Sequence, residues 1–320
     1  MSAAALAAIE EANHMIYTLT TNPAIDMNLT GRGIAPNCVN RTGNVVYSPN
    51  GKGVNVSLVL EHFGIESKAL GFFGGFTGKY IIEELQQRHV AAFPIWVEDT
   101  TRVNIFINDG IDEYKFVNPG SFVPQEKQQD FINLLRAFTD CEHLVISGSL
   151  PPGIATDYYD KILHTCEKKG TRCILDISSP KLKDLLRYKP LLIKPNDDEL
   201  AAIFGLTTES EADILVALRK LHGLGAQNIL LTLGERGSYF SNGSEVYACG
   251  IQPVKLVSSA CAGDAALGAF LSAWLQGEGI ETALKKSAAA GANVAESDAL
   301  GTMDKVPVYM KNIHVRKVDL

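Results

Sequence analysis

Short apolar runs rich in β-branched residues alternate along this chain with segments whose apolar residues recur at helical spacing. The runs that predict strands are 16–20, 69–73, 144–147, 173–176, 191–194 and 229–232. The segments that predict helices are 54–63, 77–87, 156–169, 212–224, 265–276 and 280–296. This repeated strand–helix order predicts an α/β fold in which helices cover both faces of a mainly parallel sheet.

Two stretches interrupt this order. Residues 27–47 and 102–117 alternate in polarity and contain glycine turns, which predicts strands rather than helices. We expect the two stretches to form one small β-sheet that lies as a lid over an edge of the main sheet. Residues 15–320 then form a single α/β domain, and the Ala-rich segment 1–14 is interpreted as an N-terminal extension or a cloning remnant.

The composition of the 320 residues is that of a folded globular protein, with 46% hydrophobic and 20% charged residues. The formal net charge of −7 argues against sequence-independent binding to nucleic acid, which requires a basic surface. No apolar run approaches the roughly 18 residues that span a bilayer, so no membrane partner is expected. The six cysteines include no Cys-x-x-Cys pair, which favours a protein of the reducing cytoplasm over a zinc or disulfide protein.

The loops that follow the strands are the candidate sites, because ligands of open α/β sheets bind beyond the carboxyl ends of the strands. In the first loop, Gly51 and Gly53 let the backbone approach a ligand at the start of a predicted helix. Lys52 adds positive charge, and the Asn55 amide can bond to sugar hydroxyls. The alternative is a flexible turn with an exposed lysine.

The second candidate loop, 258–264, is a run of small residues before a predicted helix. The amides of Ala262, Gly263 and Asp264 then have no acceptor within the helix and point at one spot, which suits an anion. Asp264 stands beside this spot and can take a proton from an attacking hydroxyl. The alternative is that Asp264 is only the N-cap of the helix, which is the commonest role of aspartate at such a place.

Three further loops carry weaker signals. Asn196 and Glu199 lie three residues apart after a predicted strand, so either both face a hydrated Mg²⁺ or they form a capping box. The glycine loop 232–237 either lies along nucleotide phosphates or is a simple hairpin turn. Ser149 lies in a stiff strand-end loop that offers hydroxyl groups.

Together these motifs resemble the phosphofructokinase-B family of sugar kinases, within the ribokinase-like fold, and especially its branch of 1-phosphofructokinase and tagatose-6-phosphate kinase. The segment 20–26, Thr-Thr-Asn-Pro-Ala-Ile-Asp, is similar to the opening motif of that branch. The spacing within 55–74 is similar to the first signature of the family, and 262–270 is similar to most of the second. The resemblance runs over about 15–302, nearly the whole chain.

This resemblance implies a three-layer sandwich with a β lid, and ATP-dependent phosphoryl transfer with Asp264 as the base and the Ala262 and Gly263 amides as charge stabilisers. The residues implied for the sugar are Asp26, Gly51, Lys52, Asn55, Arg102, Lys115 and Ser149. Those implied for ATP are Lys194, Asn196, Thr232, Gly234, Gly237, Cys261, Ala262, Gly263 and Asn293. Asn196 and Glu199 would hold Mg²⁺ through water, and the lids of two subunits would pair in a homodimer.

The cations Lys52, Arg102 and Lys115 lie in segments that resemble the sugar-side motifs of the branch, and we expect them to converge on a phosphate. The implied acceptor is a ketohexose monophosphate, with conversion of fructose 1-phosphate to fructose 1,6-bisphosphate as the first expectation. Tagatose 6-phosphate and fructose 6-phosphate are alternatives, as is an unphosphorylated sugar or nucleoside. A function from another class is a non-catalytic sensor of nucleotide or sugar phosphate.

Three positions depart from the pattern of the family. Asn50 and Cys261 stand where glycine is usual, and Ala265 stands where serine or threonine is usual. A side chain at Cys261 lies inside the tight turn before the predicted helix, so it either demands an unusual backbone angle or narrows the path of the nucleotide phosphates. Asn50 and Cys261 are the only sequence support for the sensor, whereas the retained Asp264 argues for an enzyme.

Overall fold

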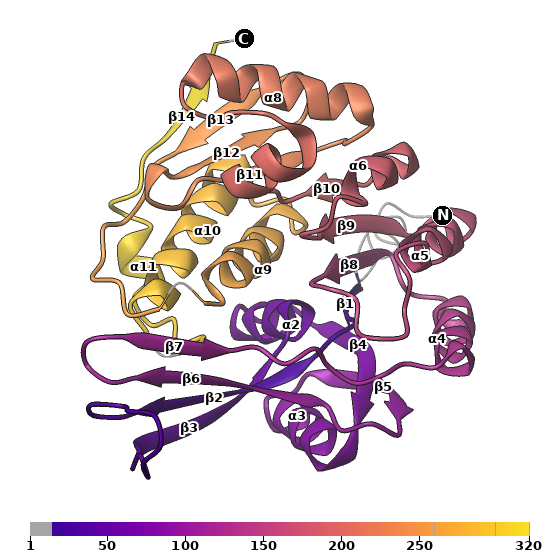
Figure 1. The fold of residues 1–320 in the computed structure, drawn as a ribbon. Helices are drawn as coiled ribbons and strands as arrows, with labels where there is room; N and C mark the ends of the chain where they lie inside the picture. The colour runs from indigo at the N-terminus through magenta and orange to yellow at the C-terminus, as the bar shows by residue number, and fades with distance from the viewer. Residues whose placement is uncertain (1–14, 259, 298, 320) are drawn as a thin grey trace.

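The computed structural model describes residues 15–258, 260–297 and 299–319 (Figure 1). The expected extension 1–14 and Ser259 of the second candidate loop lie outside the described residues. A ten-stranded sheet has the order β14-β13-β12-β11-β10-β9-β8-β1-β4-β5, and a four-stranded sheet has the order β3-β2-β6-β7. The strand pairings between β5 and β11 are parallel, and those from β11 to β14 are antiparallel, so the predicted mainly parallel sheet is confirmed.

The large sheet consists of β1 (Ile16–Thr20), β4 (Ser67–Gly74), β5 (Ala91–Val97), β8 (His143–Ser147), β9 (Arg172–Asp176), β10 (Leu192–Ile193), β11 (Ile229–Thr232), β12 (Ser238–Ser241), β13 (Val246–Cys249) and β14 (Val315–Val318). The longer helices are α2 (Lys52–His62), α3 (Gly75–Gln87), α4 (Gln125–Ala137), α5 (Tyr158–Lys169), α8 (Glu211–Leu224), α9 (Ala262–Trp274) and α10 (Ile280–Ala295). Short helical turns are α6 (Leu182–Leu185), η1 (Leu186–Tyr188), α7 (Asp197–Glu199), η2 (Leu200–Phe204), η3 (Gly234–Arg236) and α11 (Val306–Tyr309).

The helices form two layers, one on each face of the large sheet. Side chains of successive residues in a strand point to opposite faces, and the two hydrophobic clusters follow this alternation. Tyr17 and Leu19 of β1 belong to the cluster that contains Phe131 of α4, while Ile16 belongs to the cluster that contains Phe270 of α9. Both faces are therefore buried, and the predicted three-layer sandwich is confirmed. None of the helices in the described ranges is long and apolar enough to cross a membrane.

The predicted lid is the four-stranded sheet. Its strands are β2 (Ala24–Thr30), β3 (Gly43–Asn50), β6 (Arg102–Asn108) and β7 (Glu113–Phe116). The two inserted stretches meet where β2 pairs in parallel with β6, which sets Asp26 opposite Asn104. The lid lies below the large sheet in Figure 1, next to α2 and α3, and its strands β2 and β6 follow β1 and β5 directly in the chain.

The sequence analysis omits strands β5, β12, β13 and β14 of the large sheet and, among the longer helices, α4. β5 is the last strand on its side of the sheet and contains Pro94, which an edge strand tolerates but which weakens a strand prediction. α4 is mostly polar in its first two turns and buries only Phe131, Ile132 and Leu135. A narrow apolar stripe suffices because the rest of the helix faces water.

Close packing of α2 against α9 sets the position of the candidate site. A Cβ atom built on Gly268 of α9 would lie 2.8 Å from Cβ of Val59 and 3.2 Å from the carbonyl oxygen of Val56, both on α2. Neither atom is the far end of a flexible side chain. Glycine at this position therefore allows the two helix backbones to approach more closely than any side chain would permit.

We predict that Gly268→Ala destabilises the protein by about 1–3 kcal/mol, because the added methyl group overpacks the contact between α2 and α9. Gly291→Ala on α10 is the matched control, since its Cβ would meet the nearest atoms at 3.5 and 3.6 Å, which is ordinary contact. The control should be neutral or stabilising by up to about 1 kcal/mol, as expected for alanine in a helix. Urea unfolding of both variants measures the difference, and equal stabilities would contradict the overpacking argument.

Candidate active site

A cavity of about 230 Å³ lies between the lid and the carboxyl ends of the central strands. Its walls include Asn22, Asn50, Gly51, Lys52, Arg102 and Ser149. These residues come from the connection between β1 and β2, from the lid strands β3 and β6, from the start of α2 and from the loop after β8. The structure thus brings together four of the seven residues predicted for the sugar, namely Gly51, Lys52, Arg102 and Ser149, whereas Asp26, Asn55 and Lys115 do not line this cavity. It adds Asn50 and Asn22, and the sequence analysis placed Asn22 only within the opening motif.

The start of α2 is built for close approach between backbones. Gly51 precedes the helix with a φ of 130°, a conformation that side chains rarely permit. A Cβ on Gly53 would lie 2.8 Å from the carbonyl oxygen of Leu19, at the end of β1. The hydroxyl of Thr20 accepts a hydrogen bond from the Val54 amide at 2.8 Å. These contacts hold the helix start against β1 and place Lys52 on the cavity wall, whereas Asn55 is buried behind it and bonds to Asn50 and Asp264.

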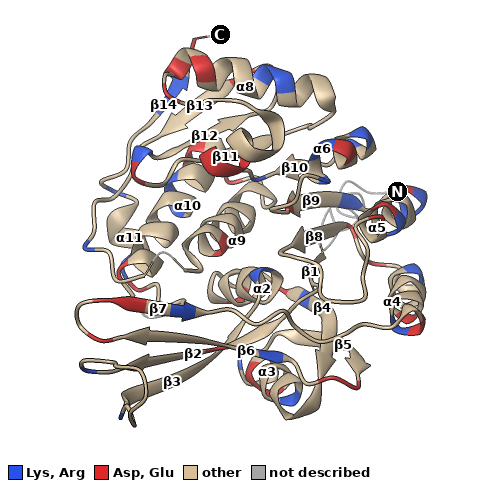
Figure 2. Ribbon diagram, viewed as in Figure 1, with Lys and Arg blue, Asp and Glu red and all other residues tan. Residues whose placement is uncertain are grey.

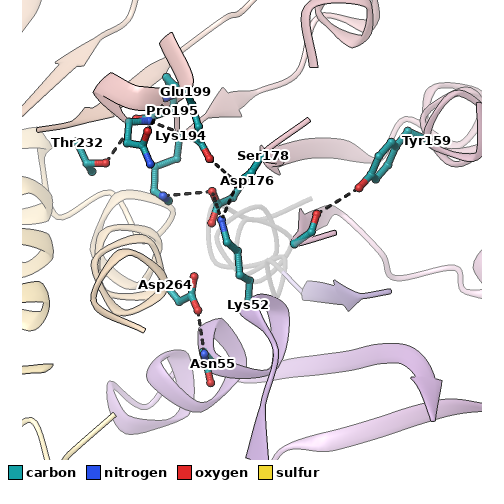
Figure 3. A network of polar contacts seen from close by, with 12 residues as sticks. Lys52, Asn55, Tyr159, Asp176, Ser178, Lys194, Pro195, Glu199, Thr232 and Asp264 are labelled. Carbon is teal, nitrogen blue, oxygen red and sulfur yellow. Dashed lines mark hydrogen bonds and ion pairs between the residues drawn. The ribbon is translucent and has the colours of Figure 1, made fainter. Parts of the chain in front are cut away.

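Asp264 is the third residue of α9, and the residue before the helix is Cys261. The alternative in which Asp264 is the N-cap is therefore wrong. Its carboxylate is 7% exposed and accepts a hydrogen bond from Nδ2 of Asn55 on α2 at 2.8 Å (Figure 3). Burial and the neighbouring charge of Asp176 raise the pKa of Asp264 to about 6. A carboxylate with such a pKa is a stronger base than an exposed one and is still largely ionised at neutral pH.

Asp176, at the end of β9, is a charged residue that the sequence analysis did not single out. It is fully buried and lies 3.3 Å from Nζ of Lys52 and 3.2 Å from Nζ of Lys194. Burial alone would raise the pKa of Asp176, but the two ammonium groups outweigh it and hold the pKa below its usual value. The only signal in the sequence is an aspartate that ends an otherwise apolar strand, and only the fold shows that two lysines flank it.

Lys52 and Lys194 therefore share one anionic partner. Lys52 reaches Asp176 from α2, and Lys194 reaches it from the end of β10, as Figure 3 shows. Burial acts to lower the pKa of Lys52, but Asp176, Asp264 and Glu199 together raise it, so the lysine stays charged. The result is a buried cluster of alternating charges that joins the sugar-side loop to the loop predicted for the nucleotide.

Asn196 and Glu199 form the capping box that was the alternative to a metal site. The Asn196 side chain accepts from the Glu199 amide at 2.7 Å, and the Glu199 carboxylate accepts from the Asn196 amide at 3.0 Å. The other carboxylate oxygen of Glu199 accepts from the hydroxyl of Ser178. No cluster of metal-ligating side chains occurs among the described residues. The oxygen donors of this pair are nevertheless of the kind that suits Mg²⁺, and each keeps a lone pair for a metal-bound water.

The remaining residues predicted for ATP lie in two places. Thr232, Gly234 and Gly237 belong to the connection between the antiparallel strands β11 and β12, so this glycine loop is a hairpin turn. It runs beside Asn196, which pairs with Thr232 in an isolated bridge. Asn293 of α10 accepts a hydrogen bond from the Lys305 amide at 3.0 Å, so its side chain tethers the chain that follows α10.

On the lid side, the Asp26 carboxylate is buried and accepts hydrogen bonds from Asn104, at 2.9 Å, and from Asn50. Burial raises the pKa of Asp26 even though both amides and Arg102 act to lower it. Arg102 donates to the carbonyl oxygens of Asn118, at 2.7 Å, and Asn22, at 3.1 Å. No carboxylate of the described residues forms an ion pair with this guanidinium, which leaves its charge available to an anion in the cavity.

The other two predicted sugar-side residues have different surroundings. The Ser149 hydroxyl accepts a hydrogen bond from Nδ2 of Asn22 at 3.4 Å and lies on the cavity wall. Lys115 is half exposed on β7 and pairs with Glu113 at 2.9 Å. It does not line the cavity with Lys52 and Arg102. The prediction that three cations converge is therefore wrong for Lys115 in this structure, because its position on β7 lies outside the cavity.

Cys261 adopts a left-handed backbone with a φ of 63°, so the altered backbone angle expected of this departure from glycine is confirmed. Its Sγ atom lies 3.3 Å from Nδ2 of Asn55 and 3.8 Å from Nδ2 of Asn50. Burial, with the negative charges of Asp264 and Asp26, raises the pKa of the thiol. This favours an inert thiol over a reactive one, although Cys261 stands at a helix N-terminus.

Comparison with known proteins agrees with this geometry. The pfkB family carbohydrate kinase profile matches residues 15–306. The chain is 50% identical to the D-tagatose-1-phosphate kinase of Klebsiella oxytoca over 94% of this chain and 99% of that protein. It is 31% identical to the 1-phosphofructokinase of Bacillus subtilis over 95% of this chain and 100% of that protein.

Among solved structures, phosphofructokinase-2 from Escherichia coli in complex with substrates and products superposes with a TM-score of 0.85 at 27% identity. The superposition covers 93% of this chain and 99% of that chain. Family profile, sequence relatives and fold agree over nearly the whole length. The chain therefore belongs to the pfkB family of carbohydrate kinases, and it is a phosphotransferase that acts on an alcohol group.

Proposed function

We propose that this protein transfers the γ-phosphoryl group of ATP to the C6 hydroxyl of a ketohexose 1-phosphate, with D-tagatose 1-phosphate as the preferred acceptor. The observation that carries the chemistry is the buried carboxylate of Asp264. It lies in the first turn of α9 and accepts a hydrogen bond from the Asn55 side chain of α2. The choice of acceptor rests on the 50% identity to a D-tagatose-1-phosphate kinase, against 31% for a 1-phosphofructokinase. Fructose 1-phosphate, the first expectation from the sequence, becomes the second candidate.

The other functions considered have less support. Sugar 6-phosphates would place the phosphate at the end of the molecule that reacts in this proposal. A sensor needs no base, yet Asp264 is kept where burial raises its pKa toward neutrality. An unphosphorylated sugar would bring no anion to Arg102, whose only carboxylate neighbour with an electrostatic effect is Asp26 among the described residues, or to Lys52 in the same cavity.

In the proposed reaction, Asp264 takes the proton of the acceptor hydroxyl as the phosphoryl group is transferred. The amides of Ala262, Gly263 and Asp264 lie in the first turn of α9, where they have no acceptor within the helix, and they stabilise the negative charge of that group. Lys194 stands 3.6 Å from the position of a Cβ on Gly263, close enough to share this role. The buried ion pairs with Asp176 hold Lys52 and Lys194 in place before substrate arrives.

The proposed ATP site continues from Lys194 past Asn196 to the hairpin at Thr232, Gly234 and Gly237. Asn196 and Glu199 would hold Mg²⁺ through water, and the ion would neutralise charge on the nucleotide phosphates. The lid would close over the sugar through Asp26 and Arg102 and exclude water, which limits wasteful hydrolysis of ATP.

We predict that Asp264→Asn lowers turnover by a factor on the order of 10²–10⁴ while the affinity for ATP stays nearly unchanged. Asparagine keeps the shape of the side chain and its position in the helix but cannot accept the proton. ADP release in a coupled assay with tagatose 1-phosphate measures turnover, and nucleotide titration measures ATP affinity. Turnover within a few-fold of the parent would show that Asp264 is not the base.

The pH profile supplies an independent check on this assignment. A base must be ionised, so kcat/KM of the parent should fall as the pH drops through about 6, the value to which burial raises the pKa of Asp264. Above that pH the rate should level off. The acid limb should vanish in the residual activity of Asp264→Asn. Persistence of the same limb in the variant would assign it to another group.

We predict that Arg102→Ala weakens use of a phosphorylated acceptor by roughly 2–4 kcal/mol in kcat/KM, as expected for removal of one partner from a buried charge pair. The apparent affinity for ATP should barely change. Arg41→Ala is the matched control, because Arg41 is exposed in the lid between β2 and β3. Equal use of fructose and fructose 1-phosphate by the parent would contradict the proposal and favour a free-sugar kinase.

We predict that Lys115→Ala changes kcat/KM for the phosphorylated acceptor no more than the control Arg41→Ala does, because Lys115 does not line the cavity.

We also propose that two subunits pair through their lids. One face of the lid exposes apolar side chains, among them Val45 (46% exposed), Tyr47 (55%) and Phe116 (53%). Strands β2 and β3 of the lid contain almost no charged residues, as Figure 2 shows. An exposed apolar sheet face is a common site of association between subunits.

The proposed location of the protein is the cytoplasm, where the six free thiols stay reduced.

The lid pairing predicts that Phe116→Asp shifts the protein from dimer to monomer in sedimentation velocity, because a buried carboxylate would face apolar side chains across the interface. Val216→Asp on α8 is the control, since Val216 is comparably exposed (52%) but lies far from the lid. A parent that is monomeric at micromolar concentration would contradict the proposal, as would a Phe116→Asp variant that remains dimeric.

A further inference from the structure

The hydroxyl of Ser178 joins two residues that the proposed function assigns to different substrates. Ser178 lies two residues after the end of β9, on the wall of the cavity. Its hydroxyl donates to one carboxylate oxygen of Glu199 and accepts from Nζ of Lys52 at 3.4 Å (Figure 3). Lys52 lines the cavity proposed for the sugar phosphate, and Glu199 belongs to the pair proposed for the Mg²⁺ of the nucleotide. Ser178 therefore bonds to both halves of the site.

The chemistry of the three groups fixes the direction of these hydrogen bonds. An ammonium group can only donate and a carboxylate can only accept, so the single proton of the Ser178 hydroxyl goes to Glu199 and its lone pairs accept from Lys52. Each bond in such a chain polarises the next. The charge of Glu199 also reaches the lysine directly, because it is one of the charges that raise the pKa of Lys52.

Both ends of this chain are held independently of Ser178. The ammonium group of Lys52 also pairs with Asp176 at 3.3 Å, and the other oxygen of Glu199 is fixed by the capping box at the start of α7. Ser178 itself follows Asp176 and Ile177, which are both buried, so its backbone is anchored. A hydroxyl between two anchored groups responds when either of them changes, which is how contiguous networks carry coupling between sites.

The lysine retains a donor for the sugar phosphate. Its ammonium group has three N–H bonds, of which two point to Asp176 and Ser178, so the third is available to an anion in the cavity. In the proposed function, Glu199 turns part of its charge toward a metal-bound water when Mg–ATP is present. Glu199 then balances less of the Lys52 charge through Ser178, and the ammonium group attracts an acceptor phosphate more strongly.

We infer that Ser178 is a positioning residue that couples the nucleotide side of the site to the sugar side, so that the Mg–nucleotide complex strengthens binding of the phosphorylated acceptor. This inference rests on the proposed function. Because such coupling is reciprocal, the acceptor strengthens binding of the nucleotide by the same factor.

The test measures binding rather than turnover. Isothermal titration calorimetry gives the Kd of tagatose 1-phosphate without nucleotide and with saturating Mg²⁺ and the non-hydrolysable ATP analogue AMP-PNP, and the ratio of the two Kd values is the coupling factor. We expect a factor of at least about fivefold in the parent, the lower end of the usual range for coupled sites, and less than about twofold in Ser178→Ala. Titration of AMP-PNP with and without tagatose 1-phosphate should return the same factors.

Two further variants show whether the hydroxyl itself is responsible. Ser178→Thr keeps the hydroxyl and should keep the coupling factor of the parent. Ser179→Ala is the matched control, because the neighbouring Ser179 hydroxyl accepts from the Lys181 amide at 3.3 Å and takes no part in the chain from Lys52 to Glu199. Its coupling factor should also equal that of the parent.

Several outcomes would overturn the inference. One is a parent in which AMP-PNP leaves the Kd of the acceptor unchanged, and another is a Ser178→Ala variant with the coupling factor of the parent. A variant that binds the acceptor equally less tightly with and without AMP-PNP belongs to the second case, because Ser178 then has a merely structural role. Loss of coupling in Ser178→Thr or in Ser179→Ala would overturn the assignment to the Ser178 hydroxyl.

The titrations also separate this inference from the proposed function. They involve no phosphoryl transfer, so they do not depend on Asp264 as the base. If the parent does not bind tagatose 1-phosphate, the proposed acceptor fails, and the same titrations are made with fructose 1-phosphate and fructose 6-phosphate. A coupling factor that is lost in Ser178→Ala with either of these supports the role of Ser178 without the proposed acceptor. A factor that does not depend on Ser178, or a parent that binds none of the three, overturns it.

Discussion

The site depends on three buried charges, Asp176, Lys194 and Asp264, and on the partly exposed Lys52 that pairs with the first of them. Asp176 is fully buried between Lys52 and Lys194, and Asp264 lies close enough for Asp176 to raise its pKa. A buried charge is unfavourable unless opposite charges and hydrogen bonds compensate for its lost hydration. The lysines supply the opposite charge at Oδ1 of Asp176, whereas its Oδ2 is buried without a hydrogen-bond partner among the described residues. Asp264 receives only the Asn55 amide and the more distant field of the lysines, and this incomplete compensation is what makes it basic.

The same junction explains why the two helices that frame the site must be so close. Asn55 lies in the first turn of α2 and Asp264 in the first turn of α9, and their hydrogen bond requires both helix starts to meet at the cavity. Gly268 permits this approach one turn further along α9, where any side chain would collide with Val59. A close packing contact between two helices in the core thus sets the geometry of a polar contact in the site.

The register of its strands decides which residues the lid contributes to the site. Arg102 and Asn104 line the cavity because β2 and β6 pair in parallel, with Ala24 opposite Arg102 and Asp26 opposite Asn104. Lys115 fails to reach it because β7 pairs with the far part of β6, where Phe106 is its partner. Arg102 and Lys115 both lie in the second inserted stretch and yet have different surroundings, and a difference in position along the lid strands is sufficient to separate them.

The sequence by itself determined the alternation of strands and helices, the two inserted β stretches, and the residue types at the glycine loops and at Asp264. These features are local, because periodicity, turn chemistry and motif spacing depend on neighbours in the chain. Only the tertiary structure decided that Asp176 joins Lys52 to Lys194, that Lys115 lies outside the cavity, and that Asn50 touches Cys261. Each of these contacts links segments whose separation depends on strand order, register and helix packing, and those follow from burial of the whole core rather than from any short stretch of residues.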